Sequence, residues 1–216
     1  TDFYDIGLVR KFEDKTIAKE LFLNLGCNCL PSLSVEDAQK DSSPFEILVL
    51  KETTSLGGLG NTKVSKAGIT AFNFQSDKKY IIEPFVPGDS FCSIYFIGET
   101  IDNIGTTKQI IKNDFFYGGN IYPASNVEQI QYETDKVAQR LHKIGFRGWV
   151  GIDSKRNNAV YLLEINPRLN GSTLPLLRRR ELDYSYMACS VVYTGKLPTA
   201  KEFEKTVTDH DEVIPF

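Results

Sequence analysis

The segment from Gly148 to Arg168 constrains the fold more than any other, because it predicts a β-hairpin with two unlike faces. Successive side chains of a strand point to opposite faces of the sheet. A turn centred on Asn158–Ala159 gathers one apolar set on a single face: Val150, Ile152, Tyr161, Leu163 and Ile165. The opposite face carries Asp153, Glu164 and Asn166, and the same turn sets Asp153 across from Glu164.

The acidic face of this hairpin predicts a cation site. Carboxylates on directly paired residues lie about 5 Å apart and repel each other unless a cation lies between them. With the amide oxygen of Asn166 they supply three hard oxygen donors, which suit Mg²⁺ or the similar Mn²⁺. Arg168 follows two residues later and suits the phosphates that such an ion carries. The alternative is a solvated strand face that is acidic by chance. This alternative stays open because the apolar Val160 and Leu162 share the face with the carboxylates.

Composition excludes several classes of protein. The 216 residues suffice for a sizeable core, and 41% hydrophobic with 25% charged residues is ordinary for a soluble globular protein. A net charge of −3 provides no long basic stripe for a nucleic acid, and no apolar run reaches the roughly 18 residues of a membrane helix. The cysteines, Cys27, Cys29, Cys92 and Cys189, lack the spacing of disulfides or zinc sites, so we expect reduced thiols in a cytoplasmic protein. The chain lacks an initiator Met and the order of a signal peptide, so we expect a processed chain or part of a longer one.

A predicted strand, Phe45–Leu50, delivers Lys51 into a glycine-rich loop, Ser55–Asn61. Glycine has no Cβ, so the backbone N–H groups of such a loop approach phosphate oxygens closely, and Lys51 adds a positive charge. The pattern therefore predicts phosphate binding. The alternative is an ordinary turn after a strand, because the spacing matches neither a Walker loop nor a Rossmann fingerprint.

An N-terminal helix is predicted over Phe12–Leu25, with Asp14 as its N-cap. Lys15 and Lys19 are four residues apart and therefore lie on the same side of this helix. From there they are candidates to reach the same phosphates. The alternative is that one or both are ordinary solvated lysines.

A second candidate segment is the strand that ends at Glu83-Pro84-Phe85-Val86. A nucleobase can form hydrogen bonds with the backbone of such a strand end while it stacks on apolar side chains. Asp89, which follows Gly88, is a candidate to hold ribose hydroxyls. The alternative is a sharp bend between two subdomains.

The remaining pattern predicts strands over Ser90–Ile97, Thr100–Gly105 and Lys108–Ile111, a loop over Phe115–Asn120, a helix over Glu128–Ile144 and a last helix over Thr173–Tyr193. This order divides the chain into four parts. Residues 1–44 hold the lysine helix and its lead-in, residues 45–88 a small subdomain with the glycine loop, residues 89–198 a larger subdomain with the cation site, and residues 199–216 a tail.

In this order the elements resemble the ATP-grasp superfamily over about Phe12–Tyr193, most specifically in Gly-Ile-Asp at 151–153 and Leu-Leu-Glu-Ile-Asn-Pro-Arg at 162–168. Residues 108–123 are most similar to the branch of pyrrolysine-biosynthesis and tyramine–glutamate ligases. The resemblance implies an α+β fold whose two α+β subdomains grip ATP between antiparallel sheets. It also implies an enzyme that joins a carboxylate to an amine through an acyl phosphate, with MgATP hydrolysed to ADP and phosphate. The alternatives are a phosphotransferase or carboxylase with a non-amine acceptor, and a non-catalytic MgATP-binding module.

The resemblance also assigns roles to residues. Arg168 and Lys51 would be catalytic, and Asp153, Glu164 and Asn166 would hold Mg²⁺. The residues that would bind the nucleotide are Lys15, Lys19, Lys51, Ser55, Gly57, Gly58, Gly60, Glu83, Pro84, Phe85, Val86, Asp89 and Leu163. Among them Glu83, Phe85 and Val86 would hold adenine. Asp89 is assigned to ribose because Ser90 stands where many members have Glu.

The implied partners are a small-molecule carboxylate and an amine, such as amino acids. Residues that we expect to line their pocket are Tyr117, Asn120, Arg147, Arg168, Asn170 and Ser172. Members of the superfamily usually carry an N-terminal α/β domain, whereas only about eleven residues precede Phe12 here. A partner chain or a second copy would then complete the pocket, or trimming removed that domain, or the protein does less than a complete ligase.

Overall fold

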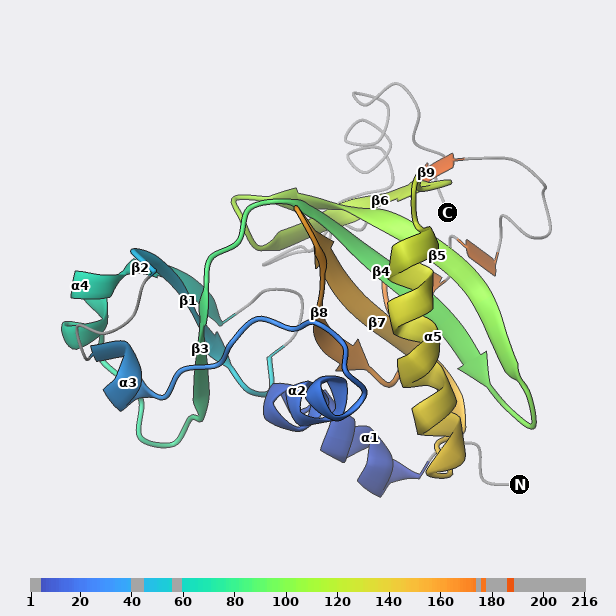
Figure 1. Cartoon of the computed structure of the whole chain (residues 1–216), viewed down its shortest axis with the longest axis horizontal. Coiled ribbons are helices and arrows are strands. Elements are labelled where there is room, and N and C mark those ends of the chain that lie inside the picture. Colours follow the sequence, from blue (N-terminus) through green and yellow to red (C-terminus); the bar gives the residue numbers. More distant parts are fainter. Residues whose placement is uncertain (1–4, 40–44, 56–59, 174–175, 178–185, 189–216) are drawn as a thin grey trace, which may run out of the picture.

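The computed structural model describes residues 5–39, 45–55, 60–173, 176–177 and 186–188 as a mixed α+β fold built on two antiparallel sheets. The smaller sheet, with two short helices, forms one lobe, and the larger sheet with its covering helices forms the other (Figure 1). No helix within these residues has the length and apolar character needed to cross a membrane.

The small sheet has the strand order β2-β1-β3, with β1 at Ile47–Glu52, β2 at Asn61–Ser65 and β3 at Tyr80–Pro84. Helices α3 (Val35–Gln39) and α4 (Lys66–Thr70) cover its apolar face. The lobe has its own core, formed by Ala38, Leu48, Leu50, Ile69 and Ile82. The alternation of Leu48 and Leu50 in β1 leaves Val49 and Lys51 on the other face.

The large sheet has the order β8-β7-β4-β5-β6-β9. Its strands are β4 (Asp89–Ile97), β5 (Ile101–Lys112), β6 (Phe116–Tyr122), β7 (Gly148–Arg156), β8 (Val160–Asn166) and β9 (Tyr186–Ala188). Two predicted strands between residues 100 and 111 are therefore one long strand, and the predicted loop over residues 115–120 belongs largely to β6. The helix predicted over Thr173–Tyr193 is wrong at residues 186–188, which pair with β6. The predicted tail, residues 199–216, lies outside the described residues.

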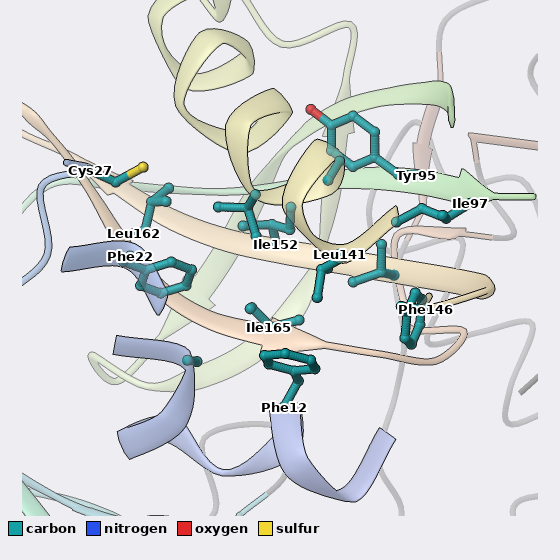
Figure 2. Close-up of a cluster of buried hydrophobic side chains, with 14 residues drawn as sticks. Phe12, Phe22, Cys27, Tyr95, Ile97, Leu141, Phe146, Ile152, Leu162 and Ile165 are labelled. Carbon is teal, nitrogen blue, oxygen red and sulfur yellow. The ribbon is translucent and has the colours of Figure 1, made fainter. Parts of the chain in front are cut away.

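One face of the large sheet packs against three helices: α1 (Ile6–Glu13), α2 (Lys15–Asn24) and α5 (Glu128–Lys143). Figure 2 shows Phe12 and Phe22 from the first two helices and Leu141 from α5 meeting sheet residues in one buried cluster. The single helix predicted over Phe12–Leu25 is two helices, because Asp14 has an extended backbone and ends α1. Asp14 also caps α2 by accepting a hydrogen bond from the Thr16 N–H, as predicted.

The β7–β8 hairpin contains a β-bulge that the alternating pattern does not reveal. Asp153 pairs with Glu164, as predicted, but the register then shifts so that Ser154 pairs with Leu162. Leu163 is the extra residue, and the shift turns Leu162 into the core while Leu163 faces away from it. The prediction that Tyr161 and Leu163 share the core face with Ile165 is therefore wrong. The bulge also removes the apolar Leu162 from the acidic face.

Three of the cysteines, Cys27, Cys29 and Cys92, are free thiols in the part of the chain that the structure describes. Cys189 lies outside the described residues.

Replacement of Phe22 by Ala tests how far α2 depends on the large-sheet core. Phe22 is fully buried, so Phe22→Ala is expected to lower the free energy of unfolding by about 3–5 kcal/mol. Its neighbour Leu23 is 65% exposed on the same helix, and Leu23→Ala is expected to change stability by less than about 0.5 kcal/mol. Urea unfolding followed by circular dichroism measures both. Similar effects for the two variants would contradict the docking of α2 by Phe22.

Candidate functional site

A pocket between the two sheets brings together most of the residues predicted from sequence. Its lining includes Lys15, Lys51, Glu83, Pro84, Phe85, Val86, Asp153, Leu163, Glu164, Asn166 and Arg168. They come from α2, β1 and β3 on one side and from β7, β8 and the segment after β8 on the other. Residues distant in sequence thus converge because the face of the small sheet that carries Val49 and Lys51 lines the same pocket as the β7–β8 hairpin.

The acidic centre of this pocket is the paired Asp153 and Glu164. Burial, and after it the negative charge of Glu164, raises the pKa of Asp153 to about 7. The Asn166 amide Nδ2 donates to Asp153 Oδ2 at 3.1 Å, while Gln109 Nε2 donates to Asp153 Oδ1 at 3.4 Å. These neutral donors stabilise the carboxylate only in part, so the site retains a strong preference for positive charge.

The donor set fits a magnesium ion. Within the described residues no cluster of three Asp, Glu, His or Cys side chains exists, and the side-chain oxygen of Asn166, which here accepts from Arg168, is a candidate third donor beside the two carboxylates. Two facing carboxylates, one of which keeps its proton up to near neutral pH, gain stability when a divalent cation replaces that proton. Asp153, Glu164 and Asn166 would then hold the ion.

Lys15 and Lys19 differ in their surroundings, although both are only 5% exposed. Lys15 Nζ lies 3.4 Å from Glu164 Oε2 and donates to the Ser55 backbone oxygen at 3.2 Å, so it joins the cation site to the start of the glycine loop. Lys19 is absent from the pocket lining, and its Nζ donates to the Leu30 carbonyl at 2.5 Å and to Glu83. Neither is the solvated lysine that formed the alternative prediction, and Lys15 is the one that reaches the pocket.

Glu83 lies between two lysines and is 1% exposed. Its carboxylate forms ion pairs with Lys19 and with Lys51, whose Nζ is 2.5 Å from Glu83 Oε2. Burial acts to raise the pKa of Glu83, but the charges of Lys51 and Lys19 outweigh it and hold the pKa below its ordinary value. The Glu83 side chain therefore orients Lys51, and hydrogen bonds from this segment to a nucleobase fall to the backbone.

The chain after β3 supplies that backbone. The Phe85 N–H donates to the Ile47 carbonyl of β1 at 3.0 Å. Because backbone polar groups alternate in direction along an extended chain, those of Pro84 and Val86 face away from β1. Both residues line the pocket, as does the Phe85 ring.

Lys155 is a pocket residue that sequence reasoning missed. Its Nζ donates to the Val86 carbonyl at 3.1 Å and lies 5.6 Å from the centroid of the Phe85 ring. Burial lowers the pKa of Lys155, and the positive charge of Lys51 lowers it further. The signal was available, because Lys155 is two residues from Asp153 and therefore lies on the same strand face.

Other predicted residues lie elsewhere. Asp89 is exposed and pairs with Lys108 at 2.9 Å, whereas its neighbour Ser90 lines the pocket. Arg147 donates to backbone carbonyls at the end of α5 and is not part of the lining, so its predicted place in the acceptor pocket is wrong. Gly60 accepts a hydrogen bond from the Glu52 N–H. Gly57 and Gly58 lie outside the described residues.

The side of the pocket next to Arg168 is lined by Tyr117, Asn170 and Ser172. Asn120 lies behind them, fully buried, where it donates to Tyr117 and to the Gly171 carbonyl. This network fixes the Tyr117 hydroxyl. Arg168 itself donates to Asn166 Oδ1 at 2.9 Å, and its Nε lies 3.4 Å from Glu13 Oε1.

A contact also crosses the pocket at its outer side. The turn between β5 and β6 contains Asn113 and Asp114, both with positive φ. It reaches the small sheet, where Lys63 Nζ of β2 lies 2.9 Å from Asp114 Oδ2 and 3.8 Å from the Phe85 ring centroid. Both members of this pair are substantially exposed.

A small lysine-bearing sheet thus faces an acidic hairpin across one pocket, and the chain that builds this arrangement belongs to the ATP-grasp family. The model of the ATP-grasp domain matches residues 12–172. Curated relatives include the tyramine–L-glutamate ligases of Methanocaldococcus fervens, 27% identical over 168 residues, and Methanocaldococcus jannaschii, 28% identical over 160 residues. These alignments cover 72% and 68% of this chain but 53% and 47% of the relatives, so the chain spans about half of their length.

Solved structures show the same fold at low identity. The biotin carboxylase domain of Hydrogenobacter thermophilus 2-oxoglutarate carboxylase, in complex with MgADP and bicarbonate, matches with a TM-score of 0.68 and 15% identity, over 80% of this chain and 43% of that one. N5-carboxyaminoimidazole ribonucleotide synthetase from Thermus thermophilus matches with a TM-score of 0.66 and 14% identity, over 81% of this chain and 50% of that one. At these identities the likeness establishes the fold.

The burial of Asp153 next to Glu164 predicts a pH-dependent stability. An unfolded Asp releases its proton near pH 3.8, whereas folded Asp153 keeps it to about pH 7, so this group lowers the free energy of unfolding as pH rises from about 4 to 7. In the absence of divalent cations, Asp153→Asn is expected to be more stable than the wild type by about 1–2 kcal/mol at pH 8 and nearly equal to it at pH 4. Asp77→Asn, which removes an exposed carboxylate, is the control. Urea titrations across this pH range test it, and a flat difference for Asp153→Asn would contradict the raised pKa of Asp153.

Proposed function

We propose that this chain is the nucleotide-binding and catalytic part of an ATP-dependent ligase that joins a small-molecule carboxylate to an amine. The observation that carries the proposal is the convergence, in one pocket, of Lys15, Lys51, the paired carboxylates and Arg168. Cations at both ends of a cation-binding carboxylate pair suit a triphosphate and its magnesium ion. The tyramine–L-glutamate ligases among the relatives support an amino acid as one substrate.

The reaction divides into two substitutions. The substrate carboxylate attacks the γ-phosphorus of ATP, the bond to the β-phosphate oxygen breaks, and ADP leaves as an acyl phosphate forms. The amine then attacks the acyl carbon, inorganic phosphate leaves with the bonding electron pair, and the amine loses a proton as the amide forms. Neither step needs a nucleophilic side chain, because alignment and charge neutralisation supply most of the rate enhancement.

Five charged side chains have parts in this scheme: Lys15, Lys51, Asp153, Glu164 and Arg168. Lys51, held by Glu83, neutralises phosphate oxygens on the small-sheet side, and Lys15 does so next to Glu164. Magnesium, held by Asp153, Glu164 and Asn166, would shield the charge of the phosphates from the attacking carboxylate. Arg168, adjacent to Asn166, stabilises the phosphoryl group in transfer and the oxygen charge on the acyl carbon.

A phosphate-release screen with MgATP tests the proposal. Pairs of amino acids and amines, starting with glutamate and tyramine, are incubated with the protein, and the products are identified by mass spectrometry. We expect at least one pair to yield an amide with one phosphate released per bond. Arg168→Gln is expected to lower the rate by about 100-fold or more, because it removes a charge that acts in the transition state.

The matched control is Arg140→Gln, an exposed arginine on α5, which should keep the wild-type rate. Asp153→Asn should lose activity even though it folds more stably. Phosphate release that survives both Arg168→Gln and Asp153→Asn would show that the reaction centre lies elsewhere. ADP formation without amide for every pair would exclude the ligase.

A further inference from the structure

Three backbone groups at the end of β3 and directly after it, from Pro84 and Val86, form an ordered row that faces the pocket. The backbone N–H and carbonyl of Ile47 point towards β3, and this carbonyl accepts a hydrogen bond from the Phe85 N–H at 3.0 Å. The groups of residues 82, 84 and 86 therefore point to the opposite edge. Leu33 occupies that edge at Ile82, whose carbonyl accepts the Leu33 N–H at 2.8 Å. Beyond this point the edge presents the Pro84 carbonyl, then the Val86 N–H and then the Val86 carbonyl.

The last of these groups is occupied by a side chain from the other sheet. Lys155 of β7 donates from its Nζ to the Val86 carbonyl at 3.1 Å. Its ammonium group also lies 5.6 Å from the Phe85 ring centroid and is part of the pocket lining. The edge of the strand therefore offers the Pro84 carbonyl as an acceptor and the Val86 N–H as a donor. At the third position the ammonium group of Lys155 stands in front of the Val86 carbonyl, so a cation replaces an acceptor.

This row matches one edge of adenine. Adenine presents a donor at N6, an acceptor at N1 and a C2–H, which fit the Pro84 carbonyl, the Val86 N–H and the space next to the Val86 carbonyl. A purine with an amino group at C2 would need the Val86 carbonyl as its acceptor. Lys155 uses this carbonyl and brings further donors and a positive charge towards the same place. A 2-amino group would thus lose its partner or expel the lysine.

We infer that Lys155 is a base-selecting residue that makes the pocket reject purine nucleotides with a 2-amino group. This inference rests on the proposed function, because it requires an adenine nucleotide to bind at the Pro84–Val86 edge. Guanine is a poor probe of Lys155, since it also reverses the donor and the acceptor at positions 6 and 1 and so conflicts with Pro84 and Val86. The informative base is 2,6-diaminopurine, which keeps N6 and N1 of adenine and adds only the 2-amino group.

The experiment compares dissociation constants of ADP, 2-amino-ADP and GDP, each with Mg²⁺, by isothermal titration calorimetry. The wild type is expected to bind ADP about tenfold or more tightly than 2-amino-ADP, because an added donor is left without its acceptor. Lys155→Met keeps the aliphatic stem and removes the ammonium group, and it is expected to bring this ratio close to one. GDP should bind weakly to both proteins.

Lys63→Met is the matched control, because Lys63 lies 3.8 Å from the centroid of the same Phe85 ring but donates to Asp114. It should keep the wild-type preference for ADP over 2-amino-ADP. A Lys155→Met variant that binds ADP and retains the full preference overturns the inference, and so does a wild type that binds ADP and 2-amino-ADP equally. The second comparison needs no variant and therefore does not depend on the folding of Lys155→Met. Absence of ADP binding to the wild type is a distinct result, which overturns the proposed function itself.

Discussion

The arrangement of this site depends on the ion pairs that the buried carboxylate of Glu83 forms. This carboxylate binds Lys19 of α2 and Lys51 of β1 from its own position on β3. A charge this deeply buried is tolerated only with partners of opposite sign, so the ion pairs couple the helix to both strands. Since Phe22 of the same helix is part of the large-sheet core, α2 is anchored to both lobes. The pocket lies between the two sheets that this helix connects.

The acidic side of the pocket depends on a different constraint, the bulge in β8. Without the extra residue at Leu163, strict alternation would place Leu162 on the same face as Glu164. With it, Leu162 enters the core, and Leu163 lines the pocket beside the carboxylates. One inserted residue thus reconciles an apolar strand with an acidic binding surface. It also explains how a three-residue turn after Arg156 is compatible with the pairing of Asp153 and Glu164.

Much of this could be predicted from sequence because the relevant signals are local. The helix over Glu128–Lys143 follows from its apolar spacing, and the cap at Asp14 from its residue type. Long-range pairing is harder to predict from the sequence, because strand β6 and the bulge in β8 depend on partners distant in the chain. The choice of Asp89 rather than Ser90 shows a further limit. Both faces of β4 are buried, so its sequence does not reveal which side faces the pocket.

The contact between Lys63 and Asp114 differs in kind from those that anchor α2. It joins the two lobes through a single exposed ion pair, which contributes at most about 1 kcal/mol and is weakened by salt. The lobes are therefore held firmly on the helix side and loosely at the tip of the β5–β6 turn. Raised ionic strength screens this exposed pair, whereas the buried ion pairs of Glu83 that hold α2 to the small sheet are screened much less.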